Sequence, residues 1–291
     1  MRLLRFELPS VVGRLPVARR FSPMIALVVA GVALSQTPGA APSVSAPVSP
    51  GAVPAAGVYV APMQVDMTEL LAPPPADGSE AARRDLSAVL EAQRTARAQH
   101  QREHAIADAS TTCGRFDDVL GVELTSARTA PALAFLDRAA REGASLSAAP
   151  KKYWHRRRPF IVDPQIERLA DIAPNGPLAS DRRSAQALAR TSYPSGHATF
   201  GTVCAILLAD MVPEKRRELF ARGQDYGHSR LVVGAHFPSD VEAGRIVGTV
   251  AVALMQENLQ FQREFAAARA QLRAALALPE TPQAQSATTV H

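Results

Sequence analysis

The sequence predicts an all-α fold, and three features of its pattern support this. Apolar residues recur at helical spacing in several long segments, for example at Leu133, Leu136 and Ala140. Serine, aspartate, proline and glycine stand where such segments begin or end. Strand-like runs are short and isolated, as at residues 231–233. The expected architecture is therefore a single-domain helical bundle.

The 291 residues, 47% of them hydrophobic, suffice for one substantial core. We expect the helical domain at residues 76–275. Residues 42–75 are rich in Pro and Ala and nearly free of charge, which predicts an extended arm or linker. Residues 276–291 are predicted to be a disordered tail.

The first helix is expected at residues 80–109, with Asp77 or Ser79 as its cap. A second is expected at residues 130–142, with Pro131 in its first turn and Gly143 just past its end. Further helices are expected at residues 146–158, 180–190, 196–211, 214–231 and 239–275.

The N-terminus has the order of a signal peptide. Residues 1–20 carry five arginines and one glutamate, and an apolar stretch at residues 24–34 leads to small residues near position 41. We therefore expect a signal peptide within residues 1–41 and a periplasmic or secreted protein. An uncleaved membrane anchor is the alternative, and the pair Arg19 and Arg20 leaves the export route open.

The charge of the chain gives no reason to expect a nucleic acid partner. Residues 1–20 contribute 5 − 1 = +4 of the total of +5, and residues 21–46 are uncharged. The mature chain is thus near +1, without the electrostatic footprint of a DNA-binding protein. No stable membrane insertion is expected after signal removal, and the oligomeric state stays open.

The chain has two cysteines, Cys113 and Cys204. An oxidising compartment permits a disulfide between them, whereas two buried thiols are the alternative. The sequence does not decide between these, because it does not give their separation in space.

Three short segments carry the residues for chemistry. In the first, Lys151 and Arg158 are seven residues apart, so we expect them on one face of a helix that Pro159 ends. Two fixed cations suit a dianionic phosphate group. Taken alone, the segment also fits a solvated basic face.

The second segment, residues 193–197, precedes an apolar helix. Ser195, Gly196 and the free N–H groups of the helix start form an anion cradle, with His197 beside it as a proton donor. A plain helix cap is the alternative.

In the third segment, Ser229 and Arg230 precede His236, and Asp240 follows it by four residues. A carboxylate at this spacing can hold one ring nitrogen and leave the other as a nucleophile. We expect Ser239 and Glu242 to form a capping box at the helix that begins there.

Together the segments match the pattern KxxxxxxRP, PSGH and SRxxxxxHxxxD at every defined position. The chain thus resembles the phosphatidic acid phosphatase type 2 and vanadium haloperoxidase superfamily, and within it the bacterial class A non-specific acid phosphatases. The resemblance covers about residues 65–260 and includes the pair Asp108 and Ala109. Ala198, and the pair Arg190 and Thr191, depart from the usual residues of those enzymes, which leaves the substrate preference open.

The resemblance implies the fold of that superfamily and an acid phosphatase that cleaves phosphate monoesters such as nucleotides. It implies that His236 attacks phosphorus, that Asp240 orients it and that His197 protonates the leaving group. The phosphate oxygens would be held by five residues: Lys151, Arg158, Ser195, Gly196 and Arg230.

No cofactor and no metal are expected, because fixed cations take the place of a metal ion. His100 and His104 are four residues apart, but the sequence offers no third ligand beside them. A lipid or diphosphate phosphatase and a vanadium-dependent haloperoxidase are alternatives on the same scaffold. A phosphate-binding protein without activity would not need the pair His236 and Asp240.

Overall fold

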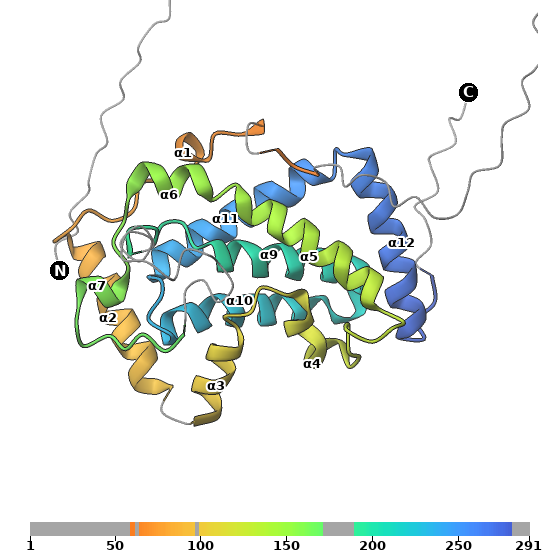
Figure 1. Ribbon diagram of the computed structural model, residues 1–291, viewed down its shortest axis with the longest axis horizontal. Coiled ribbons are helices and arrows are strands. Elements are labelled where there is room, and N and C mark those ends of the chain that lie inside the picture. Colours follow the sequence, from red (N-terminus) through yellow and green to blue (C-terminus); the bar gives the residue numbers. More distant parts are fainter. Residues whose placement is uncertain (1–58, 62–63, 97–98, 171–188, 281–291) are drawn as a thin grey trace, which may run out of the picture. The chain divides into compact units, whose positions relative to one another are not determined.

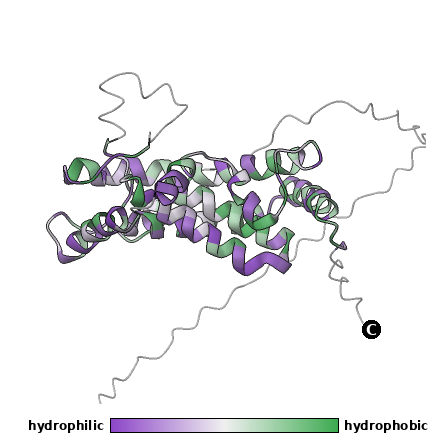
Figure 2. Ribbon diagram, turned by 90° about the horizontal axis from the view of Figure 1, so that it is seen from below, coloured by the Kyte–Doolittle hydropathy of each residue, from purple (hydrophilic) through white to green (hydrophobic). Residues whose placement is uncertain are grey.

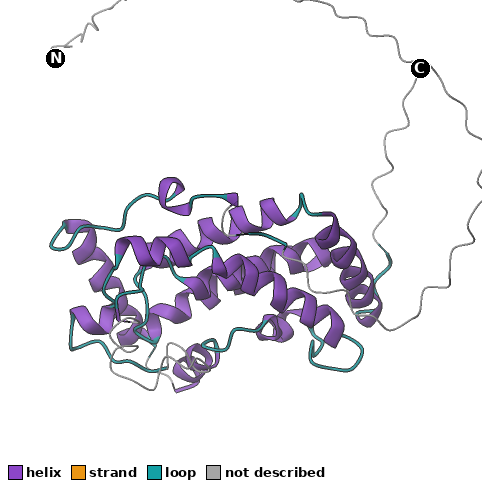
Figure 3. Cartoon of the chain, turned by 45° about the horizontal axis from the view of Figure 1, so that its top comes forward, coloured by secondary structure: helices purple, strands orange, loops and turns teal. Residues whose placement is uncertain are grey.

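The computed structural model describes residues 59–61, 64–96, 99–170 and 189–280. Within these residues the chain forms helices joined by loops, and no strand is present in them (Figure 3). The predicted all-α class is therefore confirmed. The expected signal peptide, nearly all of the helix expected at 180–190 and most of the tail lie outside the described residues.

Helix α9 (Gly196–Met211) forms the centre of the described unit, and its predicted bounds are confirmed. It packs against α5 (Ala130–Ser145), α10 (Arg216–Val232) and α11 (Pro238–Met255), as Figure 1 shows. Its apolar residues are buried nearly all round, which suits a helix enclosed by others. The predicted site residues Ser195, Gly196 and His197 lie at its N-terminal end.

Helix α5 begins close to the predicted position, with Pro131 in its first turn. The expectation that Gly143 lies past its end is wrong, because the helix continues to Ser145. Gly143 is buried, and a Cβ there would lie 3.0 Å from Val203 and 3.2 Å from Ala251. The glycine therefore serves close packing of α5 on its neighbours instead of helix termination.

The expected single helix at 80–109 is also wrong. Two helices occupy this part of the chain, α2 (Glu80–Thr95), capped by Ser79, and α3 (Gln99–Ala107). Ala96 leaves helical geometry with ψ of 51°. Both helices pack against α10 (Figure 1). A single straight helix over the same residues would not place both segments on α10. Tertiary packing has therefore overridden local helix propensity.

The expected helix at 239–275 is divided as well. Helix α11 ends at Met255, and α12 (Leu259–Ala275) begins after Asn258, whose side chain accepts hydrogen bonds from the backbone N–H groups of Gln260 and Phe261. Asparagine is a strong helix cap, so the chain turns here and α12 packs on α5.

Shorter helices complete the described residues: α1 (Met67–Leu70), η2 (Cys113–Phe116), α4 (Asp117–Leu120), α6 (Ala148–Trp154), α7 (Pro159–Val162) and η4 (Pro213–Lys215). The described part of the Pro-rich segment packs on the domain through buried side chains. The ring of Tyr59, for example, lies 5.3 Å from that of Phe261 and 5.7 Å from that of Phe135.

Among the described residues, no helix combines the length and apolar character needed to cross a bilayer. Hydrophilic residues are interspersed with hydrophobic ones along the helices (Figure 2).

Candidate active site

The second and third predicted segments meet at the N-terminal end of α9. Ser195 is the N-cap, and its Oγ accepts a hydrogen bond from the N–H of Ala198 at 3.2 Å. The N–H of Ser195 donates to the carbonyl of Asp240, in the first turn of α11, at 2.9 Å. Gly244 permits this approach, because a Cβ there would lie 2.4 Å from the Ser195 carbonyl oxygen.

A tight turn joins Arg230 to His236. The carbonyl of Arg230 accepts from the N–H groups of Ala235, at 2.9 Å, and His236, at 3.2 Å. Gly234 lies in this turn with φ of +72°, a backbone conformation that residues other than glycine rarely adopt. The turn therefore fixes the spacing between a buried cation and a buried imidazole.

The ring of His236 is polarised by two neighbours. Its Nδ1 lies 3.5 Å from Oδ2 of Asp240, and its Nε2 lies 3.0 Å from Nη1 of Arg158. A guanidinium only donates hydrogen bonds, so Nε2 is an acceptor and the ring proton is on Nδ1. Burial and the charge of Arg158 hold the pKa of His236 well below its usual value, against the opposing effect of Asp240. His236 is thus a neutral imidazole whose unprotonated nitrogen, Nε2, accepts a hydrogen bond from Arg158.

Asp240 is ionised behind this ring. Burial alone would raise its pKa, but the adjacent imidazole of His236, the charge of Arg156 and a hydrogen bond from Ser192 lower it. Its Oδ2 accepts from Oγ of Ser192 at 2.6 Å and from the N–H of Phe237 at 2.8 Å.

The predicted capping box of Ser239 and Glu242 is wrong. Phe237 is the N-cap of α11, and the carboxylate of Asp240 satisfies its N–H. Ser239 instead donates through its Oγ to Asp85 of α2. The carboxylate that caps the helix is therefore the one that orients His236.

Arg156 is a part of the site that the sequence interpretation missed. Its guanidinium donates to Oδ1 of Asp240 at 2.6 Å and to Asp85 at 2.8 Å, and it lies over the ring of Phe237. Asp85 is only 7% exposed, although most of the other polar residues of α2 face solvent. Its position four residues before the buried Val89 is the signal that marks it in the sequence.

The prediction that Lys151 and Arg158 share a helical face is wrong. Helix α6 ends at Trp154, and Arg158 is extended, with φ of −77° and ψ of 157°. Proline disfavours helical geometry in the residue before it, so Pro159 prevents Arg158 from being helical and begins α7 instead.

Lys151 and Arg158 nevertheless reach the same loop. Nζ of Lys151 donates to the carbonyls of Thr191, at 2.7 Å, and Pro194. Arg158 donates to Thr191 at 3.2 Å and to the carbonyl of Ala235 at 2.8 Å. Burial and repulsion by the charge of Arg158 lower the pKa of Lys151 to about 7, although the charge of Asp240 opposes this. Burial, partly opposed by Asp240, lowers the pKa of Arg158 to about 9.

Arg230 is fully buried at the C-terminal end of α10. Its Nη1 donates to the carbonyl of Asp108 at 2.9 Å, whereas its Nε has no hydrogen-bond partner among the described residues. A buried donor of this kind is costly unless a ligand satisfies it. The adjacent Ser229 binds Asp108 through its Oγ at 2.8 Å, so it supports the scaffold.

His197 lies in the first turn of α9. Its Nε2 is 3.1 Å from the carbonyl oxygen of Ala109. A carbonyl only accepts, so Nε2 carries a proton, and Nδ1 is the atom able to exchange one with a ligand. Burial and the charges of Arg230, Arg158 and Lys151 lower the pKa of His197 to about 3, although the hydrogen bond to Ala109 opposes this. A bound dianion would offset those charges and raise it.

These side chains together suit the transfer of a phosphoryl group. The neutral imidazole of His236 has a carboxylate behind it, and the imidazole of His197 can exchange a proton. The charges of Lys151 and Arg158 lower the pKa of both rings, and that of Arg230 lowers the pKa of His197. Ser195 and the N–H of Gly196 add donors at the positive end of α9.

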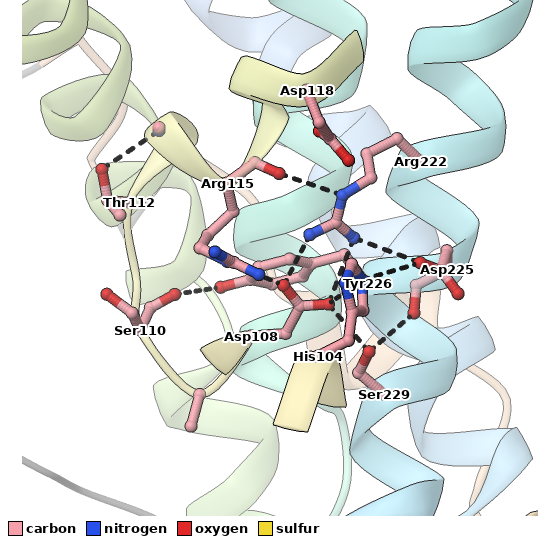
Figure 4. A network of polar contacts seen from close by, with 12 residues as sticks. His104, Asp108, Ser110, Thr112, Arg115, Asp118, Arg222, Asp225, Tyr226 and Ser229 are labelled. Atoms are coloured by element: carbon pink, nitrogen blue, oxygen red, sulfur yellow. Dashed lines mark hydrogen bonds and ion pairs between the residues drawn. The ribbon is translucent and has the colours of Figure 1, made fainter. Parts of the chain in front are cut away.

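In the structure, His104 lies beside two carboxylates that the sequence did not identify as its neighbours. Its Nε2 lies 3.1 Å from Asp225 and 3.4 Å from Asp108 (Figure 4), and these three groups lie close enough to hold a metal ion. Both carboxylates already bind Arg222, and Asp108 also binds Arg115. Two arginines thus balance the two carboxylates, so the cluster is an ion-pair network and not a favourable cation site.

The sequence left open whether Cys113 and Cys204 are paired. In the structure they form a disulfide between η2 and α9, with Cα atoms 5.5 Å apart. The bridge joins the segment that follows Ala109 to the helix that begins at the site.

The sequence profile of the PAP2 superfamily matches residues 138–263. A non-specific acid phosphatase of Salmonella typhimurium is 38% identical over 132 residues, 43% of this chain and 46% of that protein. The match thus spans about half of that relative. Those of Salmonella typhi and Providencia stuartii are 32% and 30% identical over 69% and 70% of this chain and 78% and 80% of their own lengths.

Proposed function

The chain belongs to the PAP2 superfamily, together with non-specific acid phosphatases, and we propose that it hydrolyses phosphate monoesters through a phosphohistidine on His236. One observation carries the proposal. The buried imidazole of His236 has Asp240 behind Nδ1 and Arg158 in front of Nε2. This arrangement presents a nucleophile for phosphorus beside a cation that can hold the phosphate oxygens.

In the first step the lone pair of Nε2 forms a bond to phosphorus while the bond from phosphorus to the leaving oxygen breaks. His197 transfers its Nδ1 proton to that oxygen, so the product leaves as an alcohol. Asp240 stabilises the positive charge that develops on the ring of His236, as the carboxylate of a catalytic triad does.

In the second step a water molecule gives a proton to Nδ1 of His197 and attacks phosphorus. The bond from phosphorus to Nε2 of His236 breaks, and inorganic phosphate leaves. The site thus returns to its starting protonation state, with His197 ready to act as an acid again.

Charge on the equatorial oxygens is stabilised by three cations, Lys151, Arg158 and Arg230, with Ser195 and the N–H of Gly196 as further donors. Such preorganised groups supply the electrostatic stabilisation that a metal ion gives in other phosphatases. We therefore propose a metal-independent reaction.

The natural substrates in this proposal are small phosphate monoesters such as nucleotides. The optimum is acidic, because His236 must be neutral while a proton is shared between His197 and the phosphate. We also propose that the protein acts outside the cytoplasm. The signal-like N-terminus and the Cys113–Cys204 disulfide support this location.

A hydrolysis panel on the purified protein tests the proposal. We expect turnover of nitrophenyl phosphate and nucleoside monophosphates that is unaffected by a chelator and competitively inhibited by vanadate, whose five-coordinate form resembles the transition state. Loss of activity in chelator that a divalent metal restores would exclude the metal-independent mechanism. Vanadate-dependent oxidation of halide by peroxide, without ester hydrolysis, would instead support a haloperoxidase.

A further inference from the structure

Three successive backbone carbonyls, those of residues 108–110, accept hydrogen bonds from side chains on α9 and α10. The carbonyl of Asp108 accepts from Nη1 of Arg230 at 2.9 Å. That of Ala109 accepts from Nε2 of His197 at 3.1 Å, and that of Ser110 accepts from the hydroxyl of Tyr226 at 2.6 Å. We refer to residues 108–110 as the 108–110 turn. It contacts a phosphate-binding cation and the acid–base histidine at once.

The side chain of Asp108 anchors this turn to α10 (Figure 4). Its fully buried carboxylate accepts from Arg222 at 2.5 and 3.1 Å, from Arg115 at 3.0 Å and from Ser229 at 2.8 Å. Arg222 also donates from Nε to the carbonyl of Arg115, at 2.9 Å. The turn is thus held from both sides by charged hydrogen bonds.

The charge of Asp108 is essential to this arrangement. Burial would raise its pKa, but the hydrogen bonds and charges of Arg222, Ser229 and Arg115 lower it, so the carboxylate is ionised. Arg222 is 5% exposed. Removal of one partner from a buried pair leaves the other uncompensated, and the chain around it must shift.

We propose that Asp108 is a positioning residue, which through the 108–110 turn sets the place of Arg230 and the tautomer of His197. The Ala109 carbonyl selects the ring form with a proton on Nε2, which leaves Nδ1 to exchange protons with substrate. The proposal rests on the proposed phosphatase function.

Asp108→Asn tests this with little change of shape. A displaced Arg230 weakens the binding of every ester. A misplaced His197 slows the first step, which kcat/KM reports, only for esters whose leaving group needs a proton. We expect kcat/KM to fall about 100-fold for an alkyl phosphate and about 10-fold for nitrophenyl phosphate, since a shift of 1 Å can cost on the order of 100-fold.

Glu214→Gln is the matched control. Glu214 binds the buried Arg273 of α12 through two hydrogen bonds, of 2.7 and 3.0 Å, and makes no hydrogen bond to a site residue within the described part of the chain. Like Asp108→Asn, this substitution leaves a buried arginine without its carboxylate partner. We expect it to lower the unfolding midpoint but to leave the ratio of the two kcat/KM values unchanged.

Tyr226→Phe is a milder second variant, because it keeps the ring and removes only the hydrogen bond to Ser110. We expect the same shift in the ratio of kcat/KM values, by a smaller factor.

The nitrogen-15 spectrum of the His197 ring gives a readout that does not depend on turnover. We expect the Nε2–H form in the unaltered protein and a mixture of both forms in Asp108→Asn. An unchanged ring spectrum together with equal losses on both esters would overturn the proposal. Failure of the proposed function would look different, because the unaltered protein would then hydrolyse neither ester.

Discussion

Nη1 of Arg158 lies 3.0 Å from Nε2 of His236, and both side chains are buried. This contact orients the imidazole from the side opposite to Asp240. It also places a cation next to the atom that is proposed to attack phosphorus. Nucleophile and electrostatic stabilisation are thus positioned by the same pair of residues.

Arg156→Lys is predicted to lower kcat without raising KM. Arg156 contacts Asp240 and Asp85 and not the proposed phosphate ligands, and lysine cannot bridge the two carboxylates as a planar guanidinium does. We expect kcat to fall by about 10-fold to 100-fold, because small misplacements of a catalytic group have effects of that order. Steady-state kinetics at fixed pH measure the change.

Arg157→Lys is the control for that variant. Arg157 is the next residue but is 44% exposed in its side chain and pairs with Asp77 at the surface. Its replacement should leave both constants unchanged. A rise in KM with unchanged kcat in Arg156→Lys would contradict the role assigned to Arg156.

Affinity for a dianion is predicted to fall as pH rises above about 7. Burial lowers the pKa of Lys151 to about 7, so the side chain is charged below this pH and neutral above it. Sulfate remains a dianion throughout this range, so its inhibition constant reports the protein alone. We expect that constant to rise by up to about tenfold per pH unit above the transition.

Lys151→Met should bind sulfate weakly and lose this pH dependence, whereas Lys152→Met, at an exposed neighbouring position, should retain it. The same dependence in Lys151→Met would show that another group titrates.

The double variant Cys113→Ala with Cys204→Ala is predicted to be less stable. The bridge closes a separation of 91 residues, and the chain-entropy relation gives about 4 to 5 kcal/mol for a loop of that size. Denaturant unfolding of the oxidised protein, the reduced protein and the variant measures the loss. Equal midpoints for all three would contradict a stabilising role.

The sequence predicts the elements that local signals define. Helix α9 has its expected bounds because Ser195 is a strong cap and the apolar run that follows is continuous. The division between α6 and α7 depends on the effect of Pro159 on Arg158, which a simple helical period does not include. The prediction from spacing therefore placed Lys151 and Arg158 near each other, but for the wrong geometric reason.

The sequence does not identify the partners of residues that pair across long separations. Asp85 lies 71 residues from Arg156, and Asp108 lies 114 residues from Arg222. Each is a charged residue in the segment predicted to be helical, where a solvent-exposed position is the usual expectation. Only tertiary packing, of α3 against α10 and of α2 against α10 and α11, brings them to buried partners.

His197→Ala is predicted to separate esters by their leaving groups. The variant lacks the proton donor, so hydrolysis of alkyl phosphates should fall by about 100-fold to 10,000-fold. Formation of the phosphoenzyme from nitrophenyl phosphate should be less affected, because nitrophenolate leaves without a proton. Burst kinetics on both substrates measure the first step, and equal losses on both would contradict the role of His197.

The site of the covalent intermediate tests the central claim most directly. In His197→Ala the water step lacks its base, so a quenched reaction with labelled nitrophenyl phosphate should accumulate phosphoenzyme. We predict that the label is acid-labile and base-stable, maps to His236 in digested peptides and is absent when His236→Ala is added. A label on Ser195, or near-normal turnover in His236→Ala, would contradict the account.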